Sequence, residues 1–236
     1  MELEFLVILS ETIRYSNIMC TRFSFVALKE DIENQFNLEI RNNLRNSYNI
    51  APTHHANIIT NDSTDRLQYL TWGLIPYTSR EGKNDGKLIN ARKEGIASSP
   101  SFRIPIRKRR CLVLADSYYV WNKKNEEIRP YRVVLKDRKI MALAGVWDIW
   151  FEKEYAIKSF SIITTIANRE ISKISPRMPV ILKNKETQKE WLQDIELDRV
   201  LELTDNVEDD ILEYYTISNK INSTRYNAMD IHEKIE

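Results

Sequence analysis

The sequence has few of the residues that build disulfide frameworks and metal centres. Its two cysteines, Cys20 and Cys111, lie far apart, which excludes a disulfide framework and a paired-cysteine zinc pattern. Two of the three histidines, His54 and His55, are consecutive and would point to opposite faces of a strand. We therefore expect no metal and no cofactor. Cys111 lies in the apolar run CLVLA and is interpreted as a small core residue, and reduced thiols favour a cytoplasmic protein.

Long apolar runs and a large net charge are also lacking. No segment approaches the roughly 18 apolar residues that cross a bilayer, so no membrane partner is expected. The formal net charge is only +1, but residues 103–110 hold five basic side chains and no acid, and residues 194–213 hold nine acids. We interpret these segments as a solvated basic loop and a solvated acidic helix face. The basic cluster gains importance if the partner is anionic.

The first 18 residues lack the features of a secretory signal. Their apolar patch spans only residues 5–9, and the residues before it are acidic rather than basic. Met19 and Cys20 follow directly. We expect residues 1–18 to be a leader or the result of a misassigned start, with the working chain beginning at Met19 and losing that Met before the small Cys20.

What the sequence does contain is a series of strand-like runs rich in Val, Ile, Tyr, Trp and Thr. They cover residues 56–60, 67–75, 111–121, 131–135, 139–150, 159–167, 178–182 and 213–218. Most connections are too short for parallel crossovers, so we predict a single α+β domain whose mixed, mostly antiparallel sheet is curled or barrel-like. Helices are predicted over residues 28–37, from apolar spacing, and over 186–193, where Thr187 and Glu190 have capping-box spacing.

Cys20 acquires a distinctive chemistry if it becomes the first residue. A cysteine within a chain offers one nucleophile, its thiolate. An N-terminal cysteine also offers an α-amine with a pKa of about 8, which is partly neutral at pH 7. Both groups can add to one aldehyde, because the amine forms an imine and the thiol then closes a five-membered thiazolidine ring. An internal Cys20 has no such amine.

Two further segments carry groups that suit a phosphate. Asn90, Arg92 and Glu94 alternate with other residues, so an extended segment would place all three on one face. Asparagine can donate and accept hydrogen bonds, and arginine can clamp a phosphate with two of them. Arg177 precedes an apolar strand. Taken alone, the first segment is more typical of a surface turn, and the second of a structural cap.

Three apolar side chains are candidates for contacts with nucleobases, namely Pro52, Trp72 and Trp121. Tryptophans in strands are more often core residues, so the pattern alone leaves both interpretations open.

Ten ordered motifs resemble those of the SRAP family, the SOS response-associated peptidases. They are MCTRFSF, YNIAPT, LTWGLIP, INARKEG, RRCLVLADSYYVW, PYRV, ALAGVWD, SIITTIAN, ISPRMPVIL and INSTRYN. The resemblance implies an SRAP domain over residues 19–228 and a C-terminal tail over 229–236. It implies a protein that binds single-stranded DNA containing abasic sites, captures the ring-opened aldehyde as a thiazolidine crosslink, and frees its cysteine by a peptidase activity. We expect it to act as a monomer.

The resemblance also assigns roles to particular residues. Cys20 matches the crosslinking cysteine, and Asn90 matches a catalytic asparagine. Arg22, Arg92 and Arg177 match arginines that hold phosphates flanking the lesion, in line with the general role of phosphate contacts in positioning a nucleic acid. The residues that would wedge or stack against exposed bases are Pro52, Trp72 and Trp121.

Two positions depart from the family pattern. Val120 stands where the family has a catalytic glutamate, and Ser175 where it has a histidine. Such groups are expected to move protons during imine formation, ring closure and reversal, and typically contribute about 10²–10⁴-fold. Tyr118 lies on the strand face of Val120 but is a weak substitute, since a phenol has a pKa of about 10. Thr21, in place of glycine, adds bulk beside Cys20. We therefore predict slow crosslinking, slower release and impaired peptidase activity.

Two alternatives stay open. The first is a DNA-binding pseudoenzyme that uses the basic and aromatic surface without covalent chemistry. The second, a general cysteine peptidase, is the weakest, because no histidine lies where the family would pair one with Cys20.

Overall fold

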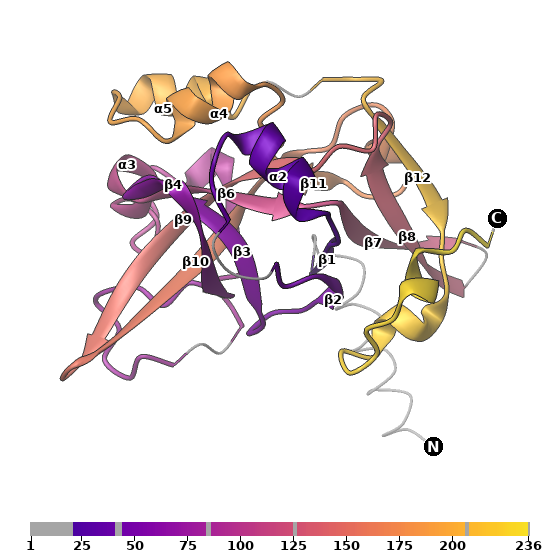
Figure 1. The fold of residues 1–236 in the computed structure, drawn as a ribbon, viewed down its shortest axis with the longest axis horizontal. Helices are drawn as coiled ribbons and strands as arrows, with labels where there is room; N and C mark the ends of the chain where they lie inside the picture. The colour runs from indigo at the N-terminus through magenta and orange to yellow at the C-terminus, as the bar shows by residue number, and fades with distance from the viewer. Residues whose placement is uncertain (1–20, 41–43, 84–85, 125–126, 206–207, 236) are drawn as a thin grey trace.

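The fold combines a closed barrel, a second sheet and a few short helices (Figure 1). The computed structural model describes residues 21–40, 44–83, 86–124, 127–205 and 208–235. Met19 and Cys20 therefore lie outside the described residues, as does the segment 1–18. None of the helices in the described part of the chain has the length and apolar character needed to cross a bilayer.

The barrel forms because five strands pair in a ring. The order is β10–β4–β3–β6–β9, and β9 pairs again with β10, which closes the ring. The short pairing of β4 with β10 is parallel and the other four pairings of this ring are antiparallel. The strands are β3 (His55–Thr60), β4 (Ser63–Trp72), β6 (Arg110–Ala115), β9 (Met141–Glu152) and β10 (Tyr155–Ile166). The predicted α+β class with a barrel-like, mostly antiparallel sheet is confirmed.

A second sheet, antiparallel throughout, continues from the barrel. Its order is β12–β8–β7–β1–β2. The strands are β1 (Arg22–Phe25), β2 (Ser47–Ile50), β7 (Ser117–Lys124), β8 (Glu127–Leu135) and β12 (Leu212–Thr216). The chain passes from the barrel strand β6 into β7 at Asp116, so the predicted run 111–121 is two strands rather than one.

Two short strands extend the barrel at β10. They are β5 (Asn90–Arg92), which pairs with β10 in parallel, and β11 (Arg177–Pro179), which pairs antiparallel. Both reach Thr164, which is opposite Arg92 in one pairing and Pro179 in the other. The two segments with predicted phosphate-binding arginines are therefore brought to the same strand.

There are four α-helices in the described residues, and α2 and α4 lie where the sequence predicts them, although the predicted cap is wrong. They are α2 (Lys29–Phe36), α3 (Pro105–Lys108), α4 (Lys185–Trp191) and α5 (Leu197–Leu203). The short 3-10 turns are η1 (Lys93–Gly95), η2 (Ile171–Lys173), η3 (Asn219–Asn222) and η4 (Met229–His232). The capping-box prediction for Thr187 and Glu190 is wrong, because Asn184 is the N-cap and accepts a hydrogen bond from the Thr187 backbone N–H at 2.8 Å.

The main core fills the barrel and the space between the two sheets. Cys111 is buried within it as predicted, and burial raises the pKa of its thiol well above the usual value. A smaller apolar cluster is formed by Tyr119 with Ile217, Ile221 and Ile231. The residues expected to form a C-terminal tail thus begin with η4, whose Ile231 is fully buried.

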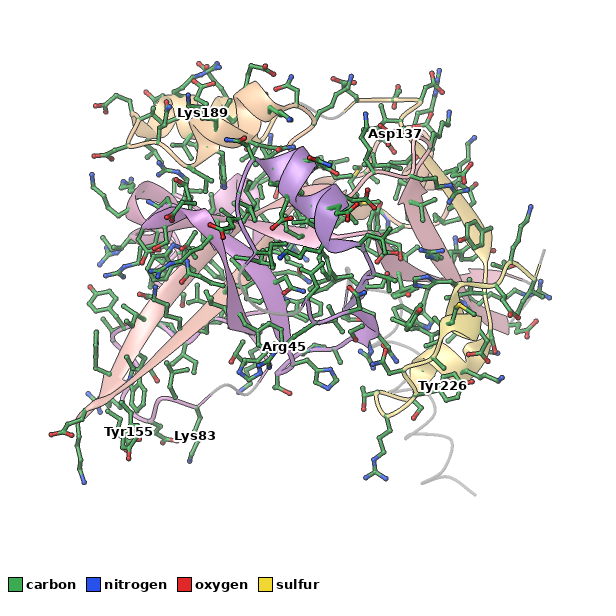
Figure 2. The ribbon with its side chains drawn as sticks, in the orientation of Figure 1. Arg45, Lys83, Asp137, Tyr155, Lys189 and Tyr226 are labelled. Carbon is green, nitrogen blue, oxygen red and sulfur yellow. The ribbon has the colours of Figure 1, made fainter. Side chains whose placement is uncertain are left out.

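One end of the barrel projects from the molecule. The hairpin of β9 and β10 extends away from the second sheet in Figure 1, and Figure 2 shows Tyr155 at its tip. Tyr155 is 76% exposed and Phe151 is 63% exposed.

The basic run at 103–110 is largely structural, which corrects the interpretation as a solvated loop. Arg110 is 1% exposed, and Arg109 binds the buried carboxylate of Asp148 at 2.5 Å. Lys108 pairs with Asp194 on the surface.

Candidate functional site

Arg22 opens strand β1 and lies two residues after Cys20. The β1–β7 register places it opposite Tyr119, so the N-terminal end of β1 lies beside the part of β7 that contains Val120. Arg22 is half-buried, and its Nη1 donates to the backbone carbonyl of Thr21 at 3.0 Å. The described residues thus begin next to the position that the sequence singles out, although they do not include Cys20 itself.

The segment with Asn90 and Arg92 is extended, as the alternation predicts. Ala91 is fully buried, while Asn90 is half-buried and Arg92 is exposed, so the latter two lie on the face away from the core. The strand ends at Arg92, and Glu94 lies in η1. The prediction that Glu94 continues the same strand face is therefore wrong.

Glu94 instead binds Arg177. Its carboxylate accepts hydrogen bonds from Arg177 Nη1 at 3.0 Å and Nη2 at 2.8 Å, and Nη2 also donates to the Thr164 carbonyl at 2.7 Å. Mainly because of these hydrogen bonds, the pKa of Glu94 is lowered. The guanidinium that was predicted to hold a phosphate is thus already engaged by a carboxylate.

Trp72 is fully buried, and the prediction that it stacks on a nucleobase is corrected. Its ring packs against Phe23 at a centroid distance of 5.0 Å and against Phe160 at 6.5 Å. The indole N–H donates to the carbonyl of Ile89 at 2.9 Å. Trp72 therefore fixes the chain immediately before Asn90 instead of offering a ring face to a ligand.

Pro52 and Trp121 keep partly exposed side chains. The indole N–H of Trp121 donates to Asn222 Oδ1 at 2.8 Å, and its ring packs beside the cluster that contains Ile221. Stacking of these two residues on bases stays a prediction.

Neither of the two substituted positions carries a side chain that ionises near neutral pH. Val120 is 2% exposed and Tyr118, its neighbour on the strand face, is fully buried. Ser175 is 8% exposed, and its hydroxyl donates to the backbone carbonyl of Arg177 at 2.7 Å. The Ser175 hydroxyl thus helps to shape the start of β11.

One feature near Arg22 is missed by the sequence patterns. The pKa of His54 is lowered, first by burial and then by the positive charge of Arg22 and by His55. An imidazole thus lies within electrostatic reach of Arg22. The sequence carries only a weak signal for it, since His54 follows Pro52 in a loop that no periodic pattern covers.

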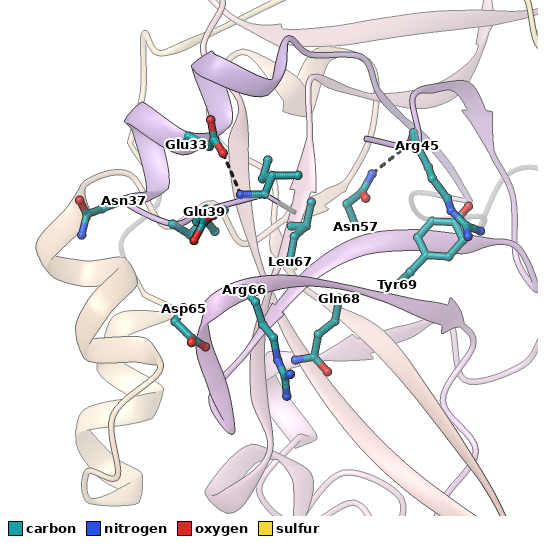
Figure 3. A pocket seen from close by; sticks show the side chains of 12 residues that line it. Glu33, Asn37, Glu39, Arg45, Asn57, Asp65, Arg66, Leu67, Gln68 and Tyr69 are labelled. Atoms are coloured by element: carbon teal, nitrogen blue, oxygen red, sulfur yellow. Dashed lines mark hydrogen bonds between the residues drawn. The ribbon is translucent and has the colours of Figure 1, made fainter. Parts of the chain in front are cut away.

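A mixed-charge groove of about 1380 Å³ lies between α2 and β4 (Figure 3). Arg45 stacks over the ring of Tyr69 at 4.2 Å on one side, and Glu33 and Asp65 contribute opposite charge on the other. None of the predicted site residues lines this groove. The described residues also contain no cluster of three or more His, Cys, Asp or Glu side chains that could bind a metal ion.

Known proteins resemble this chain over most of its length. The family model of the SOS response associated peptidases (SRAP) matches residues 19–224. The abasic site processing protein YoqW of Bacillus subtilis (strain 168) is 36% identical over 223 residues, which cover 91% of this chain and 99% of YoqW. The abasic site processing protein YobE of the same organism is 37% identical over 213 residues, covering 87% of this chain and 97% of YobE. A solved protein from Bacteroides thetaiotaomicron has a TM-score of 0.81 at 27% identity, covering 92% of this chain and all of its own.

Proposed function

This chain belongs to the SRAP family, and on that premise we propose that it processes abasic sites in DNA by a covalent reaction at Cys20. The observation that carries the proposal is the family match, which begins at Met19 and makes Cys20 the second residue of the matched segment. Relatives that share more than a third of their residues with this chain are named abasic site processing proteins.

The reaction needs only the two nucleophiles of one terminal residue. The α-amine of Cys20 adds to the ring-opened aldehyde of the abasic sugar, and loss of water gives an imine. The thiol then adds to the imine carbon, the proton moves to nitrogen, and a thiazolidine results. Aldehyde and aminothiol are consumed and one water is released, so no oxidant or cofactor enters.

Nearby groups suit a single-stranded DNA substrate. Arg22 is the first residue of β1, and the exposed Arg92 lies on β5 with the polar residue Asn90. Arginines favour phosphate oxygens, and an asparagine can hydrogen-bond the sugar oxygens.

The reaction is expected to be slow, because neither Val120 nor Ser175 ionises at neutral pH. Holding the aldehyde against the aminothiol can still lower the barrier by several kcal/mol. The same lack of an acid or base should impair self-cleavage of a leader, so we propose that Cys20 becomes terminal by removal of Met19.

A denaturing gel tests the proposal. Protein that starts at Cys20 is incubated with single-stranded DNA containing one abasic site. We expect a heat-stable protein–DNA adduct that disappears in Cys20→Ala. Cys111→Ala is the matched control, because this thiol is fully buried, and it should form the adduct at the wild-type rate. Failure of the wild-type protein to form any adduct would exclude the covalent reaction.

A second candidate function is DNA binding without covalent chemistry. It is favoured by the burial of Val120 and Ser175, which are 2% and 8% exposed and carry no acid or base. In that case wild-type protein and Cys20→Ala would bind abasic DNA equally well, and neither would form an adduct.

A further inference from the structure

His54 lies in a short loop that begins beside Arg22. The β1–β2 register pairs Phe23 with Ile50, so the chain leaves β2 next to the first residue of β1. The Ala51 N–H donates to His54 Nδ1 at 3.4 Å, and the His54 N–H donates back to the Ala51 carbonyl at 3.0 Å. The imidazole is therefore folded back over its own loop onto Ala51, the residue that follows Ile50, the partner of Phe23.

The core holds this loop in place. The Thr53 N–H donates to the Trp72 carbonyl at 2.9 Å, and the Trp72 N–H donates to the His54 carbonyl at 2.8 Å. Thr53 has a φ of 73°, a conformation that non-glycine residues adopt only when their surroundings fix it. Since Trp72 is fully buried, the position of His54 is set by the barrel and not by a free loop.

Two groups act electrostatically on His54, Arg22 from β1 and His55 from the next position. Together with burial they lower its pKa below the usual 6.5, so the imidazole is neutral at pH 7 in the absence of a ligand. A bound anion would offset the Arg22 charge and raise this pKa again, because an opposite charge nearby favours the protonated form.

We propose that His54 joins Arg22 in binding one phosphate of the DNA strand and takes up a proton from solvent when the strand binds. This inference rests on the proposed function, since it requires that the chain binds a nucleic acid. The protonated ring donates to a phosphate oxygen, and such charge-assisted hydrogen bonds are stronger than neutral ones. The ring must give up its contact with Ala51, which at 3.4 Å is long and costs little to break.

His55 is a matched control for His54. Its ring stacks on Tyr69 with ring centroids 5.2 Å apart, and its Nε2 lies 3.2 Å from Thr71 Oγ1. The one remaining histidine, His232, has a pKa of about 3 because of burial and the Arg132 charge, so it does not titrate near neutral pH. His55 thus follows His54 directly in the sequence but has different surroundings.

The test measures DNA affinity as a function of pH. Fluorescence anisotropy with a labelled oligothymidylate that has no abasic site excludes covalent capture, and ionic strength is held constant. We expect the wild-type affinity to rise as the pH falls from 7 to 5.5, by up to about tenfold per pH unit. His54→Gln should bind with little pH dependence. His55→Gln should keep the dependence, displaced slightly toward higher pH because one of the lesser causes that lower the His54 pKa is removed.

Several outcomes would overturn the inference while leaving the proposed function intact. These are pH-independent binding by the wild-type protein, an unchanged pH dependence in His54→Gln, and loss of the dependence in His55→Gln. Calorimetry of the wild-type protein in two buffers of different ionisation enthalpy measures proton uptake without any substitution, and zero uptake near pH 6.5 would also overturn it. Failure of the wild-type protein to bind single-stranded DNA at any pH would instead count against the proposed function itself.

Discussion

Residues 103–110 and the strands β1, β5 and β11 both carry arginines, but the two regions use them differently. In the first region Arg110 is 1% exposed and donates to backbone carbonyls. The acceptors lie in or just after α3 and α4, and they are the carbonyls of Ile106, Arg107, Trp191 and Gln193. In the second region Arg92 is exposed and forms no ion pair within the described residues, and Arg22 is half-buried at the start of its strand.

The difference shows that charge density along the chain does not identify a binding surface. The last carbonyls of a helix have no partner within the helix, and one guanidinium with five N–H groups can satisfy several of them. In the densest basic run, Arg110 therefore satisfies carbonyl groups at the ends of two helices. In the second region Arg177 is already paired with Glu94, and the exposed arginine without an ion pair among the described residues is Arg92, a single residue on the short strand β5.

Removing the buried guanidinium should give the largest effect on stability. Arg110→Met leaves buried carbonyls at two helix ends without partners, and we expect a loss of about 3–5 kcal/mol in the free energy of unfolding. Urea unfolding monitored by tryptophan fluorescence measures it. Lys108→Gln is the control from the same run, because its pair with Asp194 is exposed (65% and 80%) and should contribute less than about 0.5 kcal/mol. Equal losses of stability in the two variants would contradict the distinction between the structural Arg110 and the surface residue Lys108.

His232 extends the comparison to a second ionisable side chain held among polar groups, although it is half-buried, with 14% of its side chain exposed. Its Nε2 lies 3.0 Å from the Tyr119 hydroxyl and 3.9 Å from Asp116. Since its pKa is about 3 in the folded protein and near 6.5 when unfolded, the unfolded chain binds more protons below pH 6.5. The free energy of unfolding should therefore decrease as the pH is lowered from 6.5 to 4.5, by up to about 1.4 kcal/mol per pH unit.

Thermal or urea unfolding across this pH range measures the slope. His232→Gln should flatten it, while His55→Gln should not. Asp116 acts in the opposite direction at the acidic end, because burial raises its pKa above 3.8 and protonation then favours the folded state. A wild-type slope that persists in His232→Gln would contradict the assignment.

Arg92 should show the reverse behaviour, with an effect on binding and almost none on folding. Arg92→Ala is expected to weaken binding of single-stranded DNA by about tenfold and to make the logarithmic salt dependence shallower by about 0.7. Its free energy of unfolding should change by less than about 0.5 kcal/mol. If Arg92→Ala is destabilised and the salt dependence of its DNA affinity is unchanged, Arg92 has a structural role instead.

Arg177 could belong to either the structural or the DNA-binding arginines, because it is paired with Glu94. The change in DNA affinity when the Glu94 charge is removed distinguishes the two. Glu94→Gln removes the charge that competes with a phosphate for this guanidinium, so we expect a two- to threefold gain in DNA affinity, which is about 0.5 kcal/mol. Anisotropy at fixed salt measures it. A loss of affinity would show that Glu94 positions Arg177 for the strand.

The sequence predicts the fold class and most elements because these depend on local patterns. Runs rich in Val, Ile and aromatic residues became strands, and the apolar spacing around Ile32 became α2. The cap at α4 was misplaced since Thr187 and Glu190 imitate a capping box inside the helix, while Asn184 supplies the oxygen that the first turn needs.

The candidate site is less predictable because it depends on pairings distant in sequence. Trp72 is buried where β4 pairs with β10, two strands that lie far apart in the sequence. His54 comes close to Arg22 through the β1–β2 register. Neither contact can be predicted from the pattern of neighbouring residues in the sequence.

The intact mass of the protein, before and after incubation with single-stranded DNA carrying one abasic site, tests covalent capture most directly. Protein expressed from its own gene should begin at Cys20, and the adduct should equal the sum of protein and DNA less one water. A mature chain that retains residues 1–18, or a protein that begins at Cys20 and gains no mass from abasic DNA, would contradict it.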